Sequence, residues 1–234
     1  MRLIAFFIGF LPLASLAQEK ARRTCRLLML GDRGSVPAPL YLHDGTIARE
    51  VEVPRMNLSA PYEMPPGALT LRLLSAMPVE GQPVNAAAPS GTVSESMGSF
   101  YLLVTADPSN KTVPVRMQVI DASADKFKNG QMLWYNLTAN DVSGKVGKQQ
   151  VVIKGRSRAI TDPPASAAED YNVDLSYRIA GNPAVYPVCE TRWLHNPQAR
   201  TVLFLINEGG SPIPRVLAFP DNPEDGKQPG GKNP

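Results

Sequence analysis

The two cysteines and two histidines are the side chains of this sequence best suited to chemistry, and neither pair forms a catalytic motif. Cys25 and Cys189 are the only thiols, and His43 and His195 are the only imidazoles. No serine stands in the G-x-S-x-G pattern that presents a nucleophile to a histidine base. Two histidines and two cysteines also give no recognisable zinc spacing. We therefore expect no catalytic residue, no metal site and no cofactor, and we interpret both histidines as structural or surface residues.

The cysteines have a more probable use as a disulfide. An even number of cysteines in an oxidising compartment favours a bond, and two separate buried thiols are the alternative. Closing the long loop between Cys25 and Cys189 would stabilise the fold by at most about 5 kcal/mol. We predict the Cys25–Cys189 disulfide.

Carboxylates allow an enzymatic interpretation. A glycosidase needs two of them about 5 to 10 Å apart beside a cleft. The candidates are Glu50, Glu52, Glu63, Asp141 and Glu190. A deep pocket that holds two of them would favour an envelope hydrolase acting on glycan, whereas a closed sandwich with shallow faces would favour a binding protein.

Acidic and hydroxyl side chains alternate over residues 121–125, as they do in calcium loops. An EF-hand would also need glycine at the sixth position and glutamate at the twelfth, where this chain has Lys126 and Met132. We therefore predict a helical turn over 122–128, with Asp121 as its N-cap.

Four aromatic residues would form a sugar-stacking platform if one face carried them all. The alternative is that the tryptophans are core residues, as aromatic side chains in strands usually are. The four are Trp134, Tyr135, Tyr186 and Trp193.

The first seventeen residues have the pattern of a secretory signal peptide. Arg2 is basic, residues 3–13 are almost entirely apolar, and Ser15 and Ala17 are the small residues that precede a cleavage site. The apolar run is short for a membrane span, and no second one follows. We predict cleavage before Gln18 and a periplasmic or extracellular protein with no integral membrane segment after processing.

Composition limits the class of partner. The formal net charge is +3, and it falls to about +2 without Arg2. A balance so close to neutral gives no electrostatic reason to expect nucleic acid. Proline is abundant, at 23 residues, and because it breaks helices and central strands it should mark turns, strand ends and edges.

Alternating and continuous apolar runs predict an all-β fold. Turns are expected at 43–46 and 146–148, and loops at 77–98, with one short strand, and at 162–169. Residues 222–234 are poor in apolar side chains and are predicted to be a disordered tail. Strands are predicted near 26–30, 50–53, 69–74, 100–105, 113–120, 132–137, 149–154, 172–179 and 201–206.

The order of the runs suggests an internal repeat of about 100 residues. That length matches one immunoglobulin-like antiparallel β-sandwich. We predict two such modules in tandem, at 24–120 and 121–221, with a single larger sandwich as the alternative. The matched positions are Leu28 with Leu133, Leu71 with Leu175, Tyr101 with Leu203, and Val115 with Val216.

The segments YEMPPGALTLRLL (62–74) and YNVDLSYRI (171–179), together with the signal-like N-terminus, give the chain a resemblance to a known group. It resembles the uncharacterised secreted, tandem immunoglobulin-like β-sandwich proteins of Gram-negative bacteria. The resemblance implies a fold and a compartment but transfers no functional residue. We accordingly expect a non-enzymatic binding or scaffolding role, with a protein or glycan of the cell envelope as partner.

Overall fold

The computed structural model describes residues 23–31, 34, 36–79, 81–208 and 211–222. These residues form sixteen strands and no helix, which confirms the all-β prediction. The predicted signal peptide at 1–17 and nearly all of the predicted tail at 222–234 lie outside the described residues. No helix in the described part of the chain is long and apolar enough to cross a membrane.

Eight strands come from each half of the chain. The first eight are β1 (Thr24–Leu30), β2 (Leu40–His43), β3 (Ala48–Val51), β4 (Tyr62–Glu63), β5 (Leu69–Leu74), β6 (Ser90–Val93), β7 (Phe100–Ala106) and β8 (Val115–Asp121). The other eight are β9 (Met132–Asn136), β10 (Asp141–Val146), β11 (Gln149–Ile153), β12 (Arg158–Thr161), β13 (Asp170–Arg178), β14 (Val185–Leu194), β15 (Arg200–Ile206) and β16 (Arg215–Asp221).

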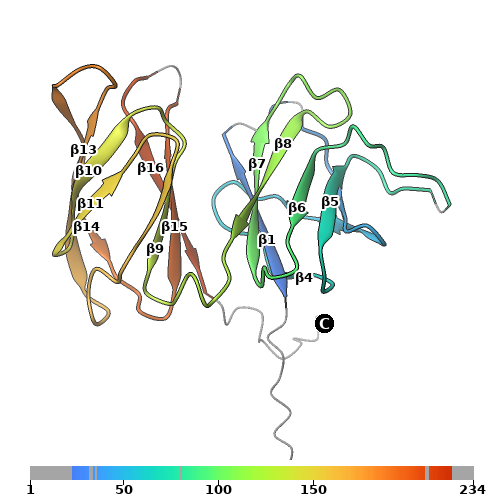
Figure 1. Ribbon diagram of the computed structural model, residues 1–234, viewed down its shortest axis with the longest axis horizontal. Helices are drawn as coiled ribbons and strands as arrows, with labels where there is room; N and C mark the ends of the chain where they lie inside the picture. Colours follow the sequence, from blue (N-terminus) through green and yellow to red (C-terminus); the bar gives the residue numbers. More distant parts are fainter. Residues whose placement is uncertain (1–22, 32–33, 35, 80, 209–210, 223–234) are drawn as a thin grey trace, which may run out of the picture.

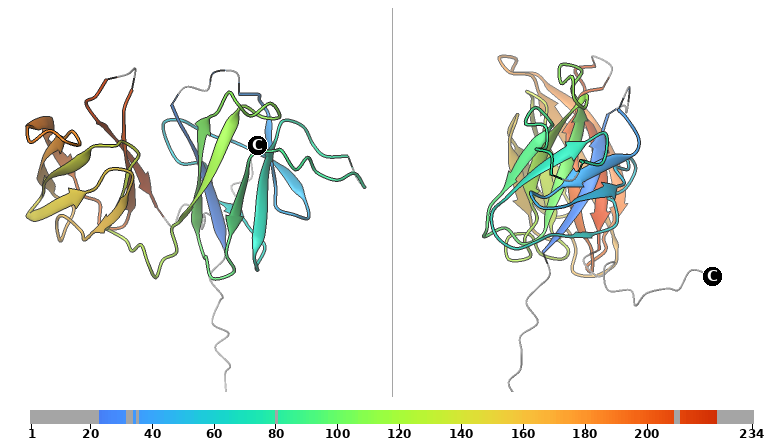
Figure 2. Two further views of the ribbon diagram at one scale, coloured as in Figure 1. Left: turned by 45° about the horizontal axis from the view of Figure 1, so that its top comes forward. Right: turned by 90° about the vertical axis from the view of Figure 1, so that its right-hand side faces the viewer.

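The strands form four sheets of four strands, and no described sheet mixes the two halves. The first half gives the orders β3-β2-β5-β6 and β4-β1-β7-β8, and the second gives β12-β9-β15-β16 and β11-β10-β13-β14. Adding eight to each strand number of the first half reproduces the second half. Figures 1 and 2 show the sheets as successive layers, in the order just given from right to left in Figure 1.

Alternating side chains of the central strands explain the layers. On β1, Leu27 and Met29 point into the core between the first two sheets, while Leu28 and Leu30 point into a core between the two middle sheets. Strand β9 divides in the same way: Leu133 enters the middle core and Trp134 enters the core of the last two sheets. Continuous apolar runs therefore mark strands that are covered on both faces.

The middle core, which we call the junction core, joins the two halves. Apolar side chains from both halves meet there, so the two halves are packed against each other and not joined by a linker alone. Its buried members are Leu28, Leu30, Leu58, Tyr101, Leu103, Ile120, Ala122, Phe127, Leu133, Tyr135, Val202, Phe204 and Phe219.

All nine predicted strands are present, with ends that differ by a few residues. The turns at 43–46 and 146–148 join β2 to β3 and β10 to β11, and β6 is the short strand expected in the 77–98 loop. The helical turn predicted over 122–128 is present as a single turn, and no α-helix forms there. Residues Lys126 and Phe127 donate their N–H groups to the Ser123 carbonyl, at 3.0 and 2.9 Å, and the turn goes no further. Asp121 does accept from the Ser123 N–H, at 3.0 Å, but as the last residue of β8.

One matched pair of the proposed repeat is out of register. Leu28 and Leu133 both face the junction core, and Leu71 and Leu175 each face the core of their own half. In contrast, Tyr101 faces the junction core, whereas Leu203 faces away from it. Because side chains alternate along a strand, a shift of one residue restores the match.

Candidate functional site

A groove of about 730 Å³ lies between the two halves, and we call it the junction groove. The end of β1 and the 55–56 segment line one side, and β16 lines the other. Met56 belongs to the side opposite β16, and 87% of its surface is exposed. The lining residues are Met29, Leu30, Gly31, Arg55, Met56, Asn207, Glu208 and Arg215 to Phe219.

Strand β16 enters this groove as an edge strand, because it pairs only with β15. Five consecutive residues, Arg215 to Phe219, line the hollow. Consecutive side chains of a strand point to opposite faces. Because the groove contacts all five residues, it must run along the edge of the strand and not only over one face. An unpaired edge presents a row of N–H and C=O groups.

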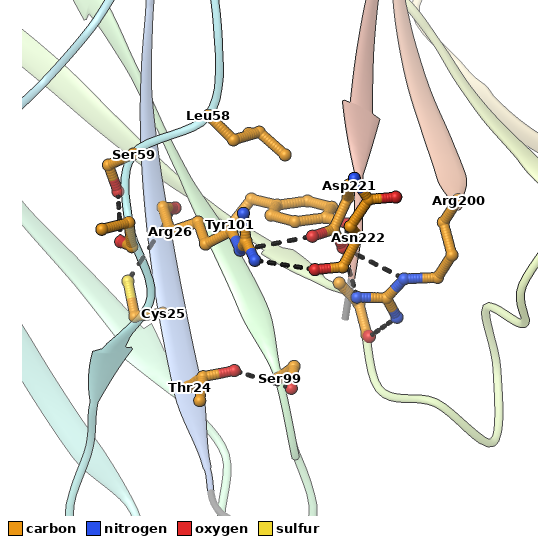
Figure 3. Close-up of polar contacts among 12 residues, drawn as sticks. Thr24, Cys25, Arg26, Leu58, Ser59, Ser99, Tyr101, Arg200, Asp221 and Asn222 are labelled. Atoms are coloured by element: carbon orange, nitrogen blue, oxygen red, sulfur yellow. Dashed lines mark hydrogen bonds and ion pairs between the residues drawn. The ribbon is translucent and has the colours of Figure 1, made fainter. Parts of the chain in front are cut away.

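A buried ionic cluster fixes the two sides of the groove relative to each other (Figure 3). Asp221 is 1% exposed at the end of β16. Its Oδ1 lies 3.2 Å from the Arg26 Nε of the first half, and its Oδ2 accepts from Arg200 and from the Tyr101 hydroxyl, which is 2.5 Å away. The carboxylate thus bonds to groups from three other strands.

The rest of the cluster satisfies the remaining donors. Arg200 Nη1 donates to the carbonyls of Ala122 and Phe127, at 2.6 and 3.1 Å, and its guanidinium lies 5.0 Å from the centre of the Phe127 ring. Burial and the Asp221 carboxylate raise the pKa of Tyr101 well above its usual value, so this hydroxyl stays a donor. A cluster that is so fully hydrogen-bonded fixes the orientation of the halves.

The predicted Cys25–Cys189 disulfide does not form in the structure. Both thiols are free. Cys25 is fully buried in the core of the first half, whereas Cys189 lies on β14 in the outermost sheet of the second half. The junction core and the whole β12-β9-β15-β16 sheet lie between the two cysteines. Their Cα atoms are therefore farther apart than a disulfide allows. Burial raises the pKa of both thiols, and the Asp174 carboxylate also raises that of Cys189.

Cys189 instead lines a second hollow, of about 300 Å³, at the open edge of the second half. Strand β14 provides one wall, and the residues at the start of β16 provide the other. Arg215 and Val216 line both this hollow and the junction groove, so the two hollows lie on either side of one strand. The lining residues are Val188, Cys189, Thr191, Trp193 and Ile213 to Val216.

The five predicted carboxylates divide between the two halves. Glu50, Glu52 and Glu63 lie in or beside β3 and β4 of the first half, and the other two lie in the second half. Glu190 stands in register with Lys145 of β10, two strands away. Asp141 lies four residues before Lys145 on that strand, so Glu190 and Asp141 are offset by about 13 Å along the strand direction. Asp141 pairs with Lys154, at 2.8 Å.

Glu190 has a carboxylate neighbour that the sequence did not indicate. Asp174 stands opposite it on β13, and Lys145 stands opposite Asp174 on β10. These residues and Arg192 line an open hollow of about 580 Å³ on the outer sheet. Pairing between β10, β13 and β14 brings these residues together. They are far apart in the sequence, so the sequence did not indicate that they are neighbours.

The predicted aromatic platform does not form, because alternation along β9 separates its members. Trp134 is fully buried in the second half and stacks on Trp193, with ring centres 6.4 Å apart. Tyr135 points the other way, into the junction core, against Phe204. Tyr186 packs on another tyrosine, Tyr177, at 5.4 Å. The core alternative is thus confirmed for Trp134.

The histidines lie apart. His43 ends β2, and its Nδ1 accepts the Gly45 N–H at 3.2 Å. His195 follows β14, is 6% exposed, and packs edge-on to Tyr171. Its Nε2 has no hydrogen-bond partner among the described atoms, and burial lowers its pKa. Neither histidine lines the junction groove.

The fold and the groove define a class: an all-β protein of packed four-stranded sheets with an edge strand exposed in a preformed groove. Comparison with known proteins adds no narrower assignment, because no protein-family model and no curated protein matches the chain. Sequence reasoning missed the groove because it did not predict β16 as a strand. The match of Val216 to Val115, a strand residue, was the one available signal.

Proposed function

We propose that this chain is an exported, non-enzymatic binding protein of the cell envelope and that it holds a protein partner in the junction groove. The observation that carries the proposal is the course of β16, whose residues Arg215 to Phe219 line the groove along an unpaired edge. Binding sites are concave, largely preformed and mostly apolar. The Asp221 cluster and the junction core hold the two sides of the groove in place, so the groove exists before a partner binds.

The same proposal includes two sandwich modules in tandem, each of immunoglobulin size. The identical strand orders of the two halves support it. An immunoglobulin constant domain places strands ABED in one sheet and CFG in the other, whereas each half here has two sheets of four with a parallel central pair, β1 with β7 and β9 with β15. The likeness therefore concerns size and sandwich architecture rather than strand order.

Export to the periplasm or beyond is supported by residues 1–17 of the sequence, in which an apolar run precedes Ser15 and Ala17. The free thiol of Cys25 does not oppose it, because burial protects that thiol from solvent.

Site-specific photo-crosslinking tests the binding role. A benzophenone amino acid would replace Met56, which is 87% exposed beside the groove, or, as the control, Val152, which is 59% exposed on β11 of the outer sheet. In cells that make the protein, we expect a discrete adduct with an envelope protein from position 56 and none from position 152. Equal adducts from both positions, or none from either, would contradict the proposal.

The envelope hydrolase remains a second candidate because of one observation, the Asp174 and Glu190 pair in the outer hollow. Both carboxylates are exposed, which is typical of a solvated sheet face. A Glu190→Gln variant decides the matter: loss of a glycan-cleaving activity of the purified protein would establish the enzyme, and an absence of activity in the unaltered protein removes it.

A further inference from the structure

We infer that the partner enters the junction groove as an extended segment that adds to β16 as a fifth strand of the β12-β9-β15-β16 sheet. The occupant is a stretch of another protein chain with apolar side chains on both faces. This inference rests on the proposed function and specifies its mode of recognition. Strand addition combines main-chain hydrogen bonds, which supply affinity, with side-chain pockets, which supply specificity.

The hydrogen-bonding register of β15 shows which groups of β16 are available. The Thr201 N–H donates to Gln131, and the Leu205 carbonyl accepts from Leu137, so odd-numbered residues of β15 bond toward β9. Their antiparallel partners on β16 therefore have N–H and C=O groups that point away from β15. Those partners include Val216, opposite Leu205, and Ala218, opposite Leu203.

Proline usage on β16 agrees with this register. Pro220 stands opposite Thr201, so its nitrogen points outward, where a missing N–H costs the sheet nothing. The outward groups of Val216 and Ala218 make no hydrogen bond with another described segment. Two donors and two acceptors thus face the groove in the spacing that a neighbouring strand requires.

The two hollows fit the alternating side chains of such a strand. On one face, Leu217 and Phe219 point toward the junction core, and Met56 lies across the groove. On the other face, Val216 packs against the core of the second half, beside the hollow that Val188 lines. An added strand would place successive side chains in one hollow and then the other, so apolar residues are favoured at both sets of positions.

A proline substitution that spares the sheet tests the strand pairing. Ala218→Pro removes an outward N–H and leaves the bonds to β15 intact, as Pro220 already does. The matched control lies on β12, at the other edge of the same sheet. The Asn136 N–H donates to Ser157, so even-numbered residues of β9 bond toward β12. Ile160, opposite Leu133, therefore points its N–H outward too, and Ile160→Pro changes the wrong edge.

The probe is a synthetic peptide of about eight residues in which valine alternates with leucine, so that both faces are apolar, and glutamate stands at each end for solubility. Its fluorescence anisotropy is measured with the full exported chain. We expect saturable binding with a Kd below about 1 mM, at least about tenfold weaker with Ala218→Pro and unchanged with Ile160→Pro. A peptide N-methylated at alternate amides should bind the unaltered chain at least about tenfold more weakly, a result that does not depend on how any variant folds.

Each other outcome has a defined meaning. No saturable binding of the peptide, or equal binding by Ala218→Pro and the unaltered chain, overturns strand addition. If Leu217→Glu abolishes the adduct from position 56 while Ala218→Pro preserves it, the groove binds a partner but not as a strand. If neither variant changes the adduct, the proposed function fails as well. A dimer of the purified chain that Ala218→Pro converts to a monomer would show that the edge pairs with a second copy, which also overturns the inference.

Discussion

At the scale of single residues, the most consequential side chain is Asp221, which the sequence did not distinguish from any other aspartate. It is buried between two guanidinium groups and a tyrosine hydroxyl. Removing one member of a buried charge cluster is costly because the others stay buried without compensation. Loss of Asp221 should therefore cost more stability than loss of one member of an exposed ion pair, such as Arg215 with Glu208.

Replacing Asp221 tests this dependence. We expect Asp221→Asn to lower the free energy of unfolding by about 3 to 5 kcal/mol, because Arg26 and Arg200 lose their shared counter-charge. Urea denaturation followed by tryptophan fluorescence measures the change. Glu208→Gln is the control and should cost less than about 1 kcal/mol. Similar costs for the two variants would show that the cluster contributes no more than a surface pair.

His195 makes stability depend on pH. Burial lowers its pKa in the folded state, so the unfolded chain binds the proton more readily. Its contribution is complete above the unfolded pKa, about 6.5, and is lost as the pH falls through that value toward the folded pKa. We expect the unfolding free energy to fall as the pH drops below about 6.5, and less steeply in His195→Gln. A slope that is the same in both proteins would contradict this assignment.

At the scale of elements, close backbone contact limits what the strands accept. A Cβ added to Gly144 of β10 would meet the Asp174 carbonyl oxygen of β13 at 1.9 Å. That oxygen belongs to the paired strand, so it is held by the ladder of hydrogen bonds between β10 and β13. The sequence analysis predicted no strand at Gly144 and gave no sign of the strand that approaches it.

We therefore expect Gly144→Ala to destabilise the protein by about 1 to 3 kcal/mol, through displacement of β13 and strain at this residue. Thermal unfolding followed by circular dichroism near 215 nm measures it. Gly181→Ala is the control, because a Cβ there meets no atom within 4 Å and only its positive φ opposes the change. An effect no larger than that of the control would show that β13 yields easily.

At the scale of the whole molecule, the junction core takes the role predicted for the disulfide. The sequence predicted a covalent link between the halves, but the structure joins them by buried apolar side chains and the Asp221 cluster. Phe204 is central to this core, since its ring lies 5.9 Å from those of Tyr135 and Phe219. Halves that share such a core should not unfold independently.

Calorimetry should accordingly show a single cooperative transition that reductant does not shift. Phe204→Ala should cost about 3 to 5 kcal/mol, as removal of a buried aromatic side chain does, and should uncouple the halves into two transitions. Leu203→Ala, at the neighbouring position that faces the core of the second half, should lower stability without splitting the transition. Two transitions in the unaltered protein would show that the junction core does not couple the halves.

The class of fold and most of the central strands could be predicted from the sequence, because alternating and continuous apolar runs are local properties of the chain. The sequence also indicated the repeat, whose spacing survives in the order of the strands. Edge strands such as β4, β12 and β16 were not predicted. Strands of two to four residues, or strands with an internal proline such as Pro220, show too little apolar alternation to be recognised.

Which residues meet became known only from the packing of the folded chain. It separated Cys25 from Cys189, sent Trp134 and Tyr135 to opposite faces, and brought Asp174 beside Glu190. It also placed the edge of β16 against the end of β1, which formed the junction groove. The physical reason is that strand pairing and sheet stacking join residues far apart in the chain, and the local periodicity of a sequence contains no information about partners at that distance.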